Sequence, residues 1–128
     1  MQIKTVLLED LLPHEHHNEA RCRRLAKNIK KTARLRRPLL VDGKTGIVLD
    51  GHHRLAALKL LGCKRARVLA VDYRSDEVKL LPRRKNILVN KNEVVKRGQA
   101  SRLNPVKTTK HQVVGGRISA STRLDRLW

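Results

Sequence analysis

The segment from residue 47 to residue 62 constrains the fold most, because it joins a short apolar strand directly to a helix. Ile47–Leu49 has the composition of a buried strand, and Asp50 and Gly51 follow it at once. Helix-forming residues then continue to Gly62, a residue type that suits the position just after a helix end. A strand that passes into a helix through one glycine predicts an α/β (α+β) fold.

The neighbouring segments supply further strands. Pro38–Val41 and Ile47–Leu49 flank Asp42–Gly46, whose glycines and polar residues are typical of a β-hairpin turn. Ile3–Leu8 and Val68–Tyr73 are two more apolar strand candidates. With 128 residues the chain has room for one core. We therefore expect a single domain with a small mixed sheet flanked by helices.

A helix is expected from residue 19 to residue 33, with Asn18 as its N-cap. One face carries apolar residues at helical spacing: Cys22, Leu25, Ala26, Ile29 and Ala33. The opposite face carries six cations with no acid to offset them: Arg21, Arg23, Arg24, Lys27, Lys30 and Lys31. Such a stripe is usually solvated surface, but its uniform sign favours an anionic partner.

The net charge supports the same class of partner. Thirty Lys and Arg residues against eleven Asp and Glu residues give +19, a field that attracts phosphate groups whatever the fold. Tyr73 and Trp128 are the only aromatic residues of the sequence, so it lacks the stacking platforms typical of single-strand binders. Nucleotides, duplex DNA and structured RNA all stay open as partners.

Several classes of protein are not expected. No apolar run approaches the ~20 residues of a membrane helix, and the first residues lack the features of a signal peptide. We therefore expect a soluble, cytoplasmic protein without a membrane partner. Cys22 and Cys63 are too far apart for a CxxC pair and are interpreted as buried thiols.

The pattern weakens after Tyr73. Asp76–Leu81 is compatible with a strand or a helix, and Asn90–Arg97 with a short helix that ends before Gly98. We assign residues 1–111 to the domain and residues 112–128 to a basic tail. That tail either is flexible or docks through apolar side chains at helical spacing, namely Leu124, Leu127 and Trp128.

The turn at Asp50–Arg54 is the first candidate for chemistry. The first turn of a helix has unpaired amide donors and the positive end of the dipole, and Gly51 lets a ligand approach the backbone. Arg54 adds a forked donor for phosphate oxygens. Asp50 is suited to hold a magnesium ion or to orient a histidine, and the alternative is a plain helix cap.

Two further segments carry reactive side chains. In His14–His17, Glu15 is a candidate general base, because a carboxylate in a cationic protein stays ionised; the alternative is a solvated loop acid. Adjacent loop histidines do not usually share one metal ion. Pro105–His111 combines hydroxyls and cations that suit a phosphate or a small zwitterion, and the alternative is a basic tail.

Three motifs in this order resemble the ParB/sulfiredoxin superfamily: Pro13–Glu15, Asp50–Arg54 and Lys107–His111. More narrowly, they resemble the archaeal free L-serine kinases, which make O-phosphoserine for cysteine synthesis. The resemblance covers roughly residues 3 to 74 and resumes near 95 to 111. It implies a small-molecule kinase that transfers a phosphoryl group from ADP or ATP to the serine hydroxyl, with Mg²⁺ bridging the phosphates.

The resemblance also implies roles for individual residues. Glu15 would be the catalytic base, and Asp50 would act beside the metal or the reacting groups. The phosphates of the nucleotide would lie against Gly51, His52, His53 and Arg54. The substrate would be bound by Lys107, Thr108, Thr109 and His111.

The sequence also departs from this family. Leu80–Arg84 replaces an aromatic-rich strand whose tryptophan helps to bind serine, and the kinases are longer, with an additional region before Lys107. His52 occupies the position of the sulfiredoxin cysteine, so peroxiredoxin repair is not expected. The 128 residues leave no room for the second domain of the ParB partition proteins, so we do not expect a partition protein. A basic ParB-like DNA-binding domain, with or without nuclease activity, is the alternative function, and no oligomeric state is predicted.

Overall fold

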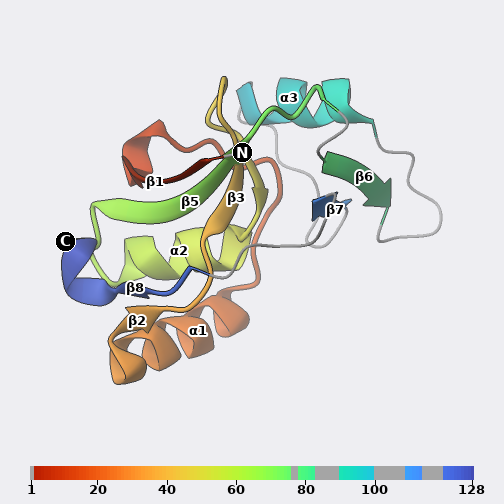
Figure 1. Ribbon diagram of the computed structural model, residues 1–128. Coiled ribbons are helices and arrows are strands. Elements are labelled where there is room, and N and C mark those ends of the chain that lie inside the picture. Colours follow the sequence, from red (N-terminus) through yellow and green to blue (C-terminus); the bar gives the residue numbers. More distant parts are fainter. Residues whose placement is uncertain (1, 76–77, 83–89, 100–108, 114–119) are drawn as a thin grey trace.

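A four-stranded mixed sheet forms the centre of the molecule (Figure 1). The computed structural model describes residues 2–75, 78–82, 90–99, 109–113 and 120–128. The strand order is β1-β5-β3-β4, in which β3 and β5 are parallel and the two outer pairs are antiparallel. The strands are β1 (Gln2–Leu7), β3 (Leu39–Asp42), β4 (Val48–Asp50) and β5 (Arg65–Val71).

Helices and two small sheets cover this sheet from both sides. On one side lie α1 (Glu19–Thr32) and α2 (His52–Leu60), which pack against each other. On the other lie α3 (Lys91–Gln99) and the antiparallel pair of β6 (Val78–Pro82) and β7 (Thr109–Val113). The pair of β2 (Arg34–Leu35) and β8 (Thr122–Arg123) lies beside α1 (Figure 1). The predicted mixed sheet flanked by helices is confirmed.

The alternation of side chains along the central strands divides the core into two clusters. Leu39 and Val41 of β3 join the cluster under α1 and α2, whereas Leu40 between them joins the cluster under α3. In β5, Val68 faces the first cluster and Leu69 the second. Strands that are buried on both faces read as continuous apolar runs, as these do.

Local signals define α1 and the hairpin as expected. The side chain of Asn18 accepts a hydrogen bond from the Arg21 amide, and α1 ends at Ala33 in the left-handed region with φ 55°. Asp42–Gly46 joins β3 to β4, and within it the Asp42 carboxylate accepts from the Thr45 hydroxyl at 2.7 Å. These contacts lie within a few residues of each other, which is why the sequence predicts them.

The fifth strand of the chain was predicted with the wrong bounds. β5 begins at Arg65 rather than Val68 and ends at Val71 rather than Tyr73. Its first residues alternate in exposure, because Ala66 faces the first core cluster whereas Arg65 and Arg67 face the opposite side of the sheet. An apolar run therefore marks the buried half of the strand and misses its charged half.

The end predicted for the next helix was also wrong. α3 continues through Gly98 to Gln99, although glycine usually follows a helix. A β-carbon at Gly98 would lie 3.0 Å from the Ile47 side chain. The glycine therefore allows α3 to pack closely on the sheet and does not end the helix.

Residues 120–128 return to the first core cluster. Leu124 and Leu127 are buried, and the Leu127 carbonyl accepts hydrogen bonds from the amides of Lys64 and Arg65. Trp128 is 48% exposed, so it does not share this burial.

Two further expectations concern the rest of the described chain. Cys22 and Cys63 are buried free thiols, as predicted, and burial raises the pKa of both. None of the helices in the described ranges combines the length and apolar character that crossing a membrane requires.

Candidate active site

The loop before α1 lies beside the first residues of β4. Leu12 forms a bridge with Ile47, and its carbonyl accepts from the Val48 amide at 2.8 Å. Two residues later, the His14 ring bonds the Val48 carbonyl through Nδ1 at 2.7 Å. Backbone pairing therefore carries the His14–His17 segment to the point where β4 passes into α2.

Gly51 makes the passage from β4 into α2 possible. Its φ of 104° lies in the left-handed region, and a β-carbon there would meet the Leu39 side chain at 3.1 Å. No side chain caps the first turn of α2 at this residue. The first turn of α2 contains His52, His53 and Arg54, and the first backbone amides of any helix lack intrahelical acceptors. The sequence predicted this helix start directly after Gly51.

Glu15 is buried between two histidines. Its Oε1 lies 3.9 Å from Nε2 of His14, and its Oε2 lies 3.9 Å from Nδ1 of His52. Because the Val48 carbonyl can only accept, His14 carries its proton on Nδ1 and turns a lone pair toward Glu15. The His14 amide donates to Nε2 of His52 at 3.2 Å, so His52 turns its Nδ1–H toward Glu15.

Glu15 therefore faces one donor and one acceptor. His52 favours the ionised carboxylate, and His14 can accept a hydrogen bond from the protonated acid. Both separations exceed hydrogen-bond length, so either contact forms only with a small shift of the side chain. A carboxylate that is accommodated in both protonation states suits a general base.

Burial keeps these histidines neutral. It lowers the pKa of His14 to about 4, against a smaller upward effect of the Val48 hydrogen bond. Burial also lowers the pKa of His52 well below 6.5, and the neighbouring histidines act in the same direction. The two rings thus supply fixed hydrogen-bonding atoms rather than positive charge.

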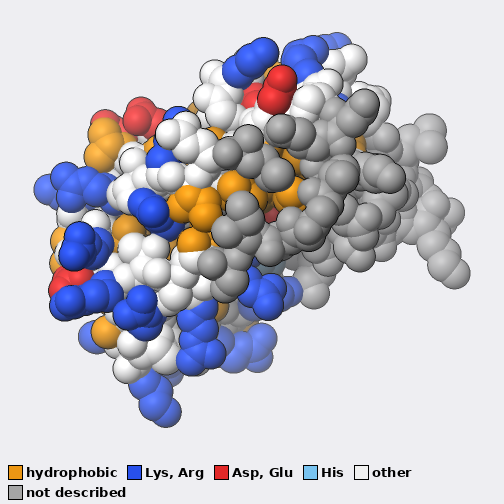
Figure 2. Space-filling model, viewed as in Figure 1, with side chains coloured by type: hydrophobic (Ala, Val, Ile, Leu, Met, Phe, Trp, Pro, Cys, Tyr) orange, Lys and Arg blue, Asp and Glu red, His pale blue; other side chains and the backbone are white. Residues whose placement is uncertain are grey.

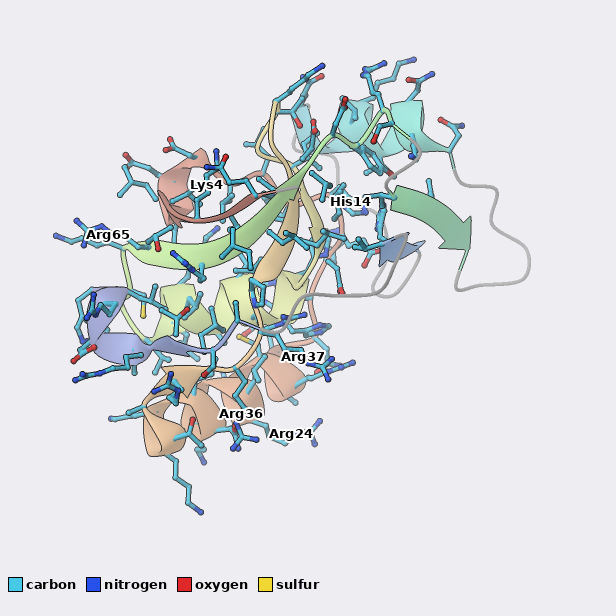
Figure 3. All side chains as sticks on the ribbon, viewed as in Figure 1. Lys4, His14, Arg24, Arg36, Arg37 and Arg65 are labelled. Carbon is cyan, nitrogen blue, oxygen red and sulfur yellow. The ribbon has the colours of Figure 1, made fainter. Side chains whose placement is uncertain are left out.

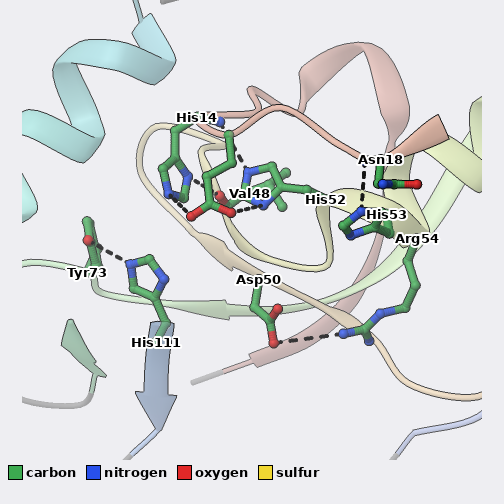
Figure 4. A network of polar contacts seen from close by, with 10 residues as sticks. His14, Asn18, Val48, Asp50, His52, His53, Arg54, Tyr73 and His111 are labelled. Carbon is green, nitrogen blue, oxygen red and sulfur yellow. Dashed lines mark hydrogen bonds and ion pairs between the residues drawn. The ribbon is translucent and has the colours of Figure 1, made fainter. Parts of the chain in front are cut away.

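Asp50, His53 and Arg54 lie around the same turn (Figure 4). The Asn18 amide donates to Nε2 of His53 at 2.9 Å. Nη1 of Arg54 donates to the Pro38 carbonyl at 2.9 Å and to the Arg37 carbonyl at 3.3 Å, while Nη2 lies 3.9 Å from Asp50. Arg54 thus fastens the segment before β3 to α2.

His111 of β7 approaches the site from the other side of the sheet. Its Nε2 lies 2.8 Å from the Tyr73 hydroxyl, and its ring stacks edge-on with His14 at 5.7 Å between centroids. Burial lowers the pKa of His111 to about 3; His14 adds to this, while Asp50 and the Leu49 carbonyl act against it. Nδ1 of His111 is buried and has no hydrogen-bond partner in the described part of the chain.

A pocket of about 920 Å³ connects these groups. Glu15, Asp50 and His111 contribute to its wall, together with Gly51–Arg54. Among the residues described, six arginines line it: Arg21, Arg24, Arg34, Arg36, Arg37 and Arg54. Four positive charges therefore remain after the two carboxylates are balanced, which suits a polyphosphate ligand.

Three of the arginines that line the pocket lie close together. Figure 3 shows Arg24, Arg36 and Arg37 together where α1 meets the segment before β3, far from Lys4 and Arg65. Figure 2 shows further Lys and Arg side chains scattered over the described part of this face, with few acids among them. The overall charge is thus widespread, and the pocket concentrates part of it.

We call the part of the pocket lined by Glu15 and the histidines its histidine side, and the part lined by the six arginines its arginine side. The sequence predicted the histidine side and half of the arginine side. Glu15, Asp50–Arg54 and His111 come together, as do Arg21 and Arg24 of the predicted stripe. Arg34, Arg36 and Arg37 were missed, although their spacing just before a predicted strand was visible. Arg23, Lys27, Lys30 and Lys31 are exposed and do not line the pocket.

The remaining predicted site residues contribute less. Lys107 and Thr108 lie outside the described residues, and only the backbone of Thr109 is described, paired with Pro82. In the loop before α1, His16 is exposed, and His17 bonds Glu19 at 2.6 Å.

A metal ion held by protein ligands alone does not fit the described residues. They contain no group of three or more His, Cys, Asp or Glu side chains placed to share an ion. Asp50, which lines the pocket together with Glu15, would supply one carboxylate ligand. One carboxylate is enough for Mg²⁺ when phosphate oxygens and waters supply the other ligands.

Comparisons with solved structures identify the fold. A glutamate-to-alanine variant of a free serine kinase in complex with ADP matches with a TM-score of 0.88 and 15% identity, over 100% of this chain and 95% of that chain. The chain has the fold of the free serine kinases. No profile of a known protein family matches the sequence.

Sequence relatives agree with that fold. The chain is 38% identical over 77 residues to an ATP-dependent L-serine kinase of Staphylothermus marinus, covering 57% of this chain and 31% of the kinase. It is 32% identical over 94 residues to an ADP-dependent L-serine kinase of Thermococcus kodakarensis, covering 70% of this chain and 39% of that kinase. The matched region thus spans 31% to 39% of the length of these two relatives. The predicted resemblance to the serine kinases is confirmed.

Proposed function

We propose that this chain transfers a phosphoryl group from ADP or ATP to the hydroxyl of free serine, giving O-phosphoserine. The observation that carries the proposal is the position of Glu15, a buried carboxylate in the wall of an arginine-lined pocket. The names of the sequence relatives support both the acceptor and the two donors.

The nucleotide phosphates are assigned to the first turn of α2. The amides of this turn can donate to phosphate oxygens, and Gly51 has no side chain that would keep a ligand from the backbone. The arginines of α1 and of residues 34–37 line the same pocket and add charged donors. His53 borders this turn with Nε2 engaged by the Asn18 amide. Arg54 acts there by its charge and by holding Arg37 and Pro38 in place.

Glu15 would act on the serine hydroxyl. The hydroxyl oxygen attacks the terminal phosphorus, the bond from that phosphorus to the nucleotide breaks, and the hydroxyl proton passes to Glu15. His14 then stabilises the protonated acid through its Nε2 lone pair, and the arginines balance the charge on the leaving phosphate.

The remaining groups are assigned to substrate and metal. His111 would donate to a substrate oxygen, and Lys107, Thr108 and Thr109 are proposed to extend that contact. Mg²⁺ bound to the phosphates would neutralise charge, with Asp50 as its protein ligand. Residues 80–84 lack the family tryptophan, so these polar groups would provide the selectivity for serine.

The direct test is a product assay with a matched control. The purified chain is incubated with L-serine, Mg²⁺ and either ADP or ATP, and O-phosphoserine is quantified. Glu15→Gln should lower kcat by roughly 10²- to 10⁴-fold while the variant stays folded. Glu19→Gln, an exposed acid four residues away, should stay within about twofold of wild type.

Two outcomes contradict the proposal: no O-phosphoserine from the wild type with either donor, or full activity of Glu15→Gln. Binding to duplex DNA or RNA stays a prediction from the +19 charge. Affinity that persists at physiological salt, together with absent kinase turnover, would favour that alternative.

A further inference from the structure

His111 has two ring nitrogens in different surroundings. Nε2 lies 2.8 Å from the hydroxyl of Tyr73, whereas Nδ1 is buried without a hydrogen-bond partner among the described residues. Figure 4 shows Nε2 directed at Tyr73 and the other nitrogen on the side of Asp50. The ring itself forms part of the pocket wall.

The proton of the Tyr73 hydroxyl favours one tautomer of His111. Tyr73 is fully buried, and burial and Asp42 both raise its pKa, so the phenol stays protonated and can donate. A neutral imidazole that accepts at Nε2 has its proton on Nδ1. The ring is neutral because its pKa is lowered to about 3.

Tyr73 is itself held rigidly. Its amide donates to Asp42 at 3.2 Å, and its carbonyl accepts from Nζ of Lys91 at 2.8 Å. The same ammonium donates to the carbonyls of Ser75 and Val78 and lies 5.0 Å from the centre of the Tyr73 ring. A hydroxyl anchored from two elements is suited to orient a neighbour.

We propose that Tyr73 is a positioning residue: its hydroxyl fixes His111 in the tautomer with Nδ1 protonated, so that the pocket wall offers one neutral N–H donor to a ligand oxygen. A buried N–H group without a hydrogen bond costs free energy, and a ligand oxygen with a lone pair relieves that cost. A hydroxyl, a carboxylate or a phosphate oxygen provides such an acceptor, and an ammonium group does not. The ligand contact rests on the proposed function, whereas the tautomer does not.

The tautomer is read by nitrogen-15 NMR of the histidine rings in the full chain. In the wild type, the Nδ1 signal of His111 should be of the protonated type and the Nε2 signal of the unprotonated type. Tyr73→Phe removes one hydroxyl and keeps the ring, so both signals should move toward the average of the two tautomers. His14 is the internal control, because its proton is held by the Val48 carbonyl in either protein. A protonated Nε2 in the wild type, or unchanged His111 signals in Tyr73→Phe, would overturn the proposal.

A titration with O-phosphoserine and then with AMP tests the contact. The Nδ1 proton signal of wild-type His111 should shift on saturation, and Tyr73→Phe should bind O-phosphoserine about 5- to 10-fold more weakly, the effect of one neutral hydrogen bond. Saturable binding with no change at His111 would overturn the ligand contact. If the protein phosphorylates no serine but the tautomer signals respond as described, the proposed function fails and the role of Tyr73 stands.

Discussion

The two sides of the pocket differ in burial and in charge. On the histidine side, Glu15, His52 and His111 line the pocket, and the buried His14 ring contacts both other rings. Burial keeps the three rings neutral, and hydrogen bonds hold them at fixed nitrogens. The arginine side is largely exposed and positively charged. The histidine side therefore acts on a ligand through hydrogen-bonding atoms at fixed positions, and the arginine side acts through its positive charge. Changes on the histidine side should therefore alter catalysis and stability, and changes on the arginine side should alter binding.

The largest expected effect is the pH dependence of stability on the histidine side. His14, His52 and His111 have folded-state pKa values below 6.5, so the unfolded chain binds more protons as the pH falls. Their contribution is present above pH 6.5 and is lost as the pH falls toward about 4. Between pH 7.5 and 5.5 the loss should be about 1.3 kcal/mol for each ring and on the order of 4 kcal/mol for all three.

Urea denaturation at the two pH values measures this loss. Most carboxylates stay ionised in that window, so they contribute little. His14→Asn removes one of the three titrating rings and should reduce the difference by about a third. An equal unfolding free energy at pH 7.5 and 5.5 would show that these rings are not neutral in the folded protein.

The next effect belongs to the arginine side. Arg24→Ala and Arg37→Ala should each weaken ADP binding about tenfold, because each removes a charged donor to phosphate, while stability changes by less than about 0.5 kcal/mol. Arg23→Ala is the matched control, since Arg23 is exposed on the same helix outside the pocket. Titration calorimetry at one ionic strength compares the ADP affinities of these three variants. Equal losses at Arg23 and Arg24 would mean that only the overall charge matters.

Arg54 joins the two sides, so its replacement should show both kinds of effect. Arg54→Ala removes hydrogen bonds to the carbonyls of Arg37 and Pro38, and should cost about 1 kcal/mol of stability and about fivefold in ADP affinity. Lys59→Ala, an exposed cation of the same helix, should change neither. A variant that loses stability but binds ADP normally would assign Arg54 to the fold alone.

The smallest effect is that of salt. Raising the ionic strength should screen the exposed arginines and raise KM for the nucleotide a fewfold, with little change in kcat. Steady-state kinetics at two salt concentrations separates these parameters. A fall in kcat with unchanged KM would place salt-sensitive charges at the chemical step rather than in binding.

The sequence predicted those parts of the site that local chemistry determines. Asn18 caps α1 and Gly51 begins α2 because a side chain or its absence acts on backbone within a few residues. The junction of β4 with α2 therefore followed from residues 47–54. The position of Glu15 beside that junction came from the resemblance, because the pairing of Leu12 with Ile47 joins residues distant in sequence.

Long-range contacts account for what sequence reasoning missed. Tyr73 and His111 are 38 residues apart, and no periodicity links a phenol to an imidazole over that separation. Two long-range contacts bring the arginines at 34, 36 and 37 into the pocket: β2 pairs with β8, and Arg54 donates to the carbonyl of Arg37. The pattern around Gly98 predicts a helix end, because nothing in the sequence indicates its close contact with Ile47.

The most direct test of the account is a structure of the Glu15→Gln variant with ADP and L-serine bound, since the substitution should prevent turnover. We predict that the phosphates contact the first turn of α2 and the arginines around it. We also predict that the serine hydroxyl lies within about 3.2 Å of the residue 15 side chain. ADP bound outside this pocket, or a residue 15 side chain turned away from the hydroxyl, would contradict the account.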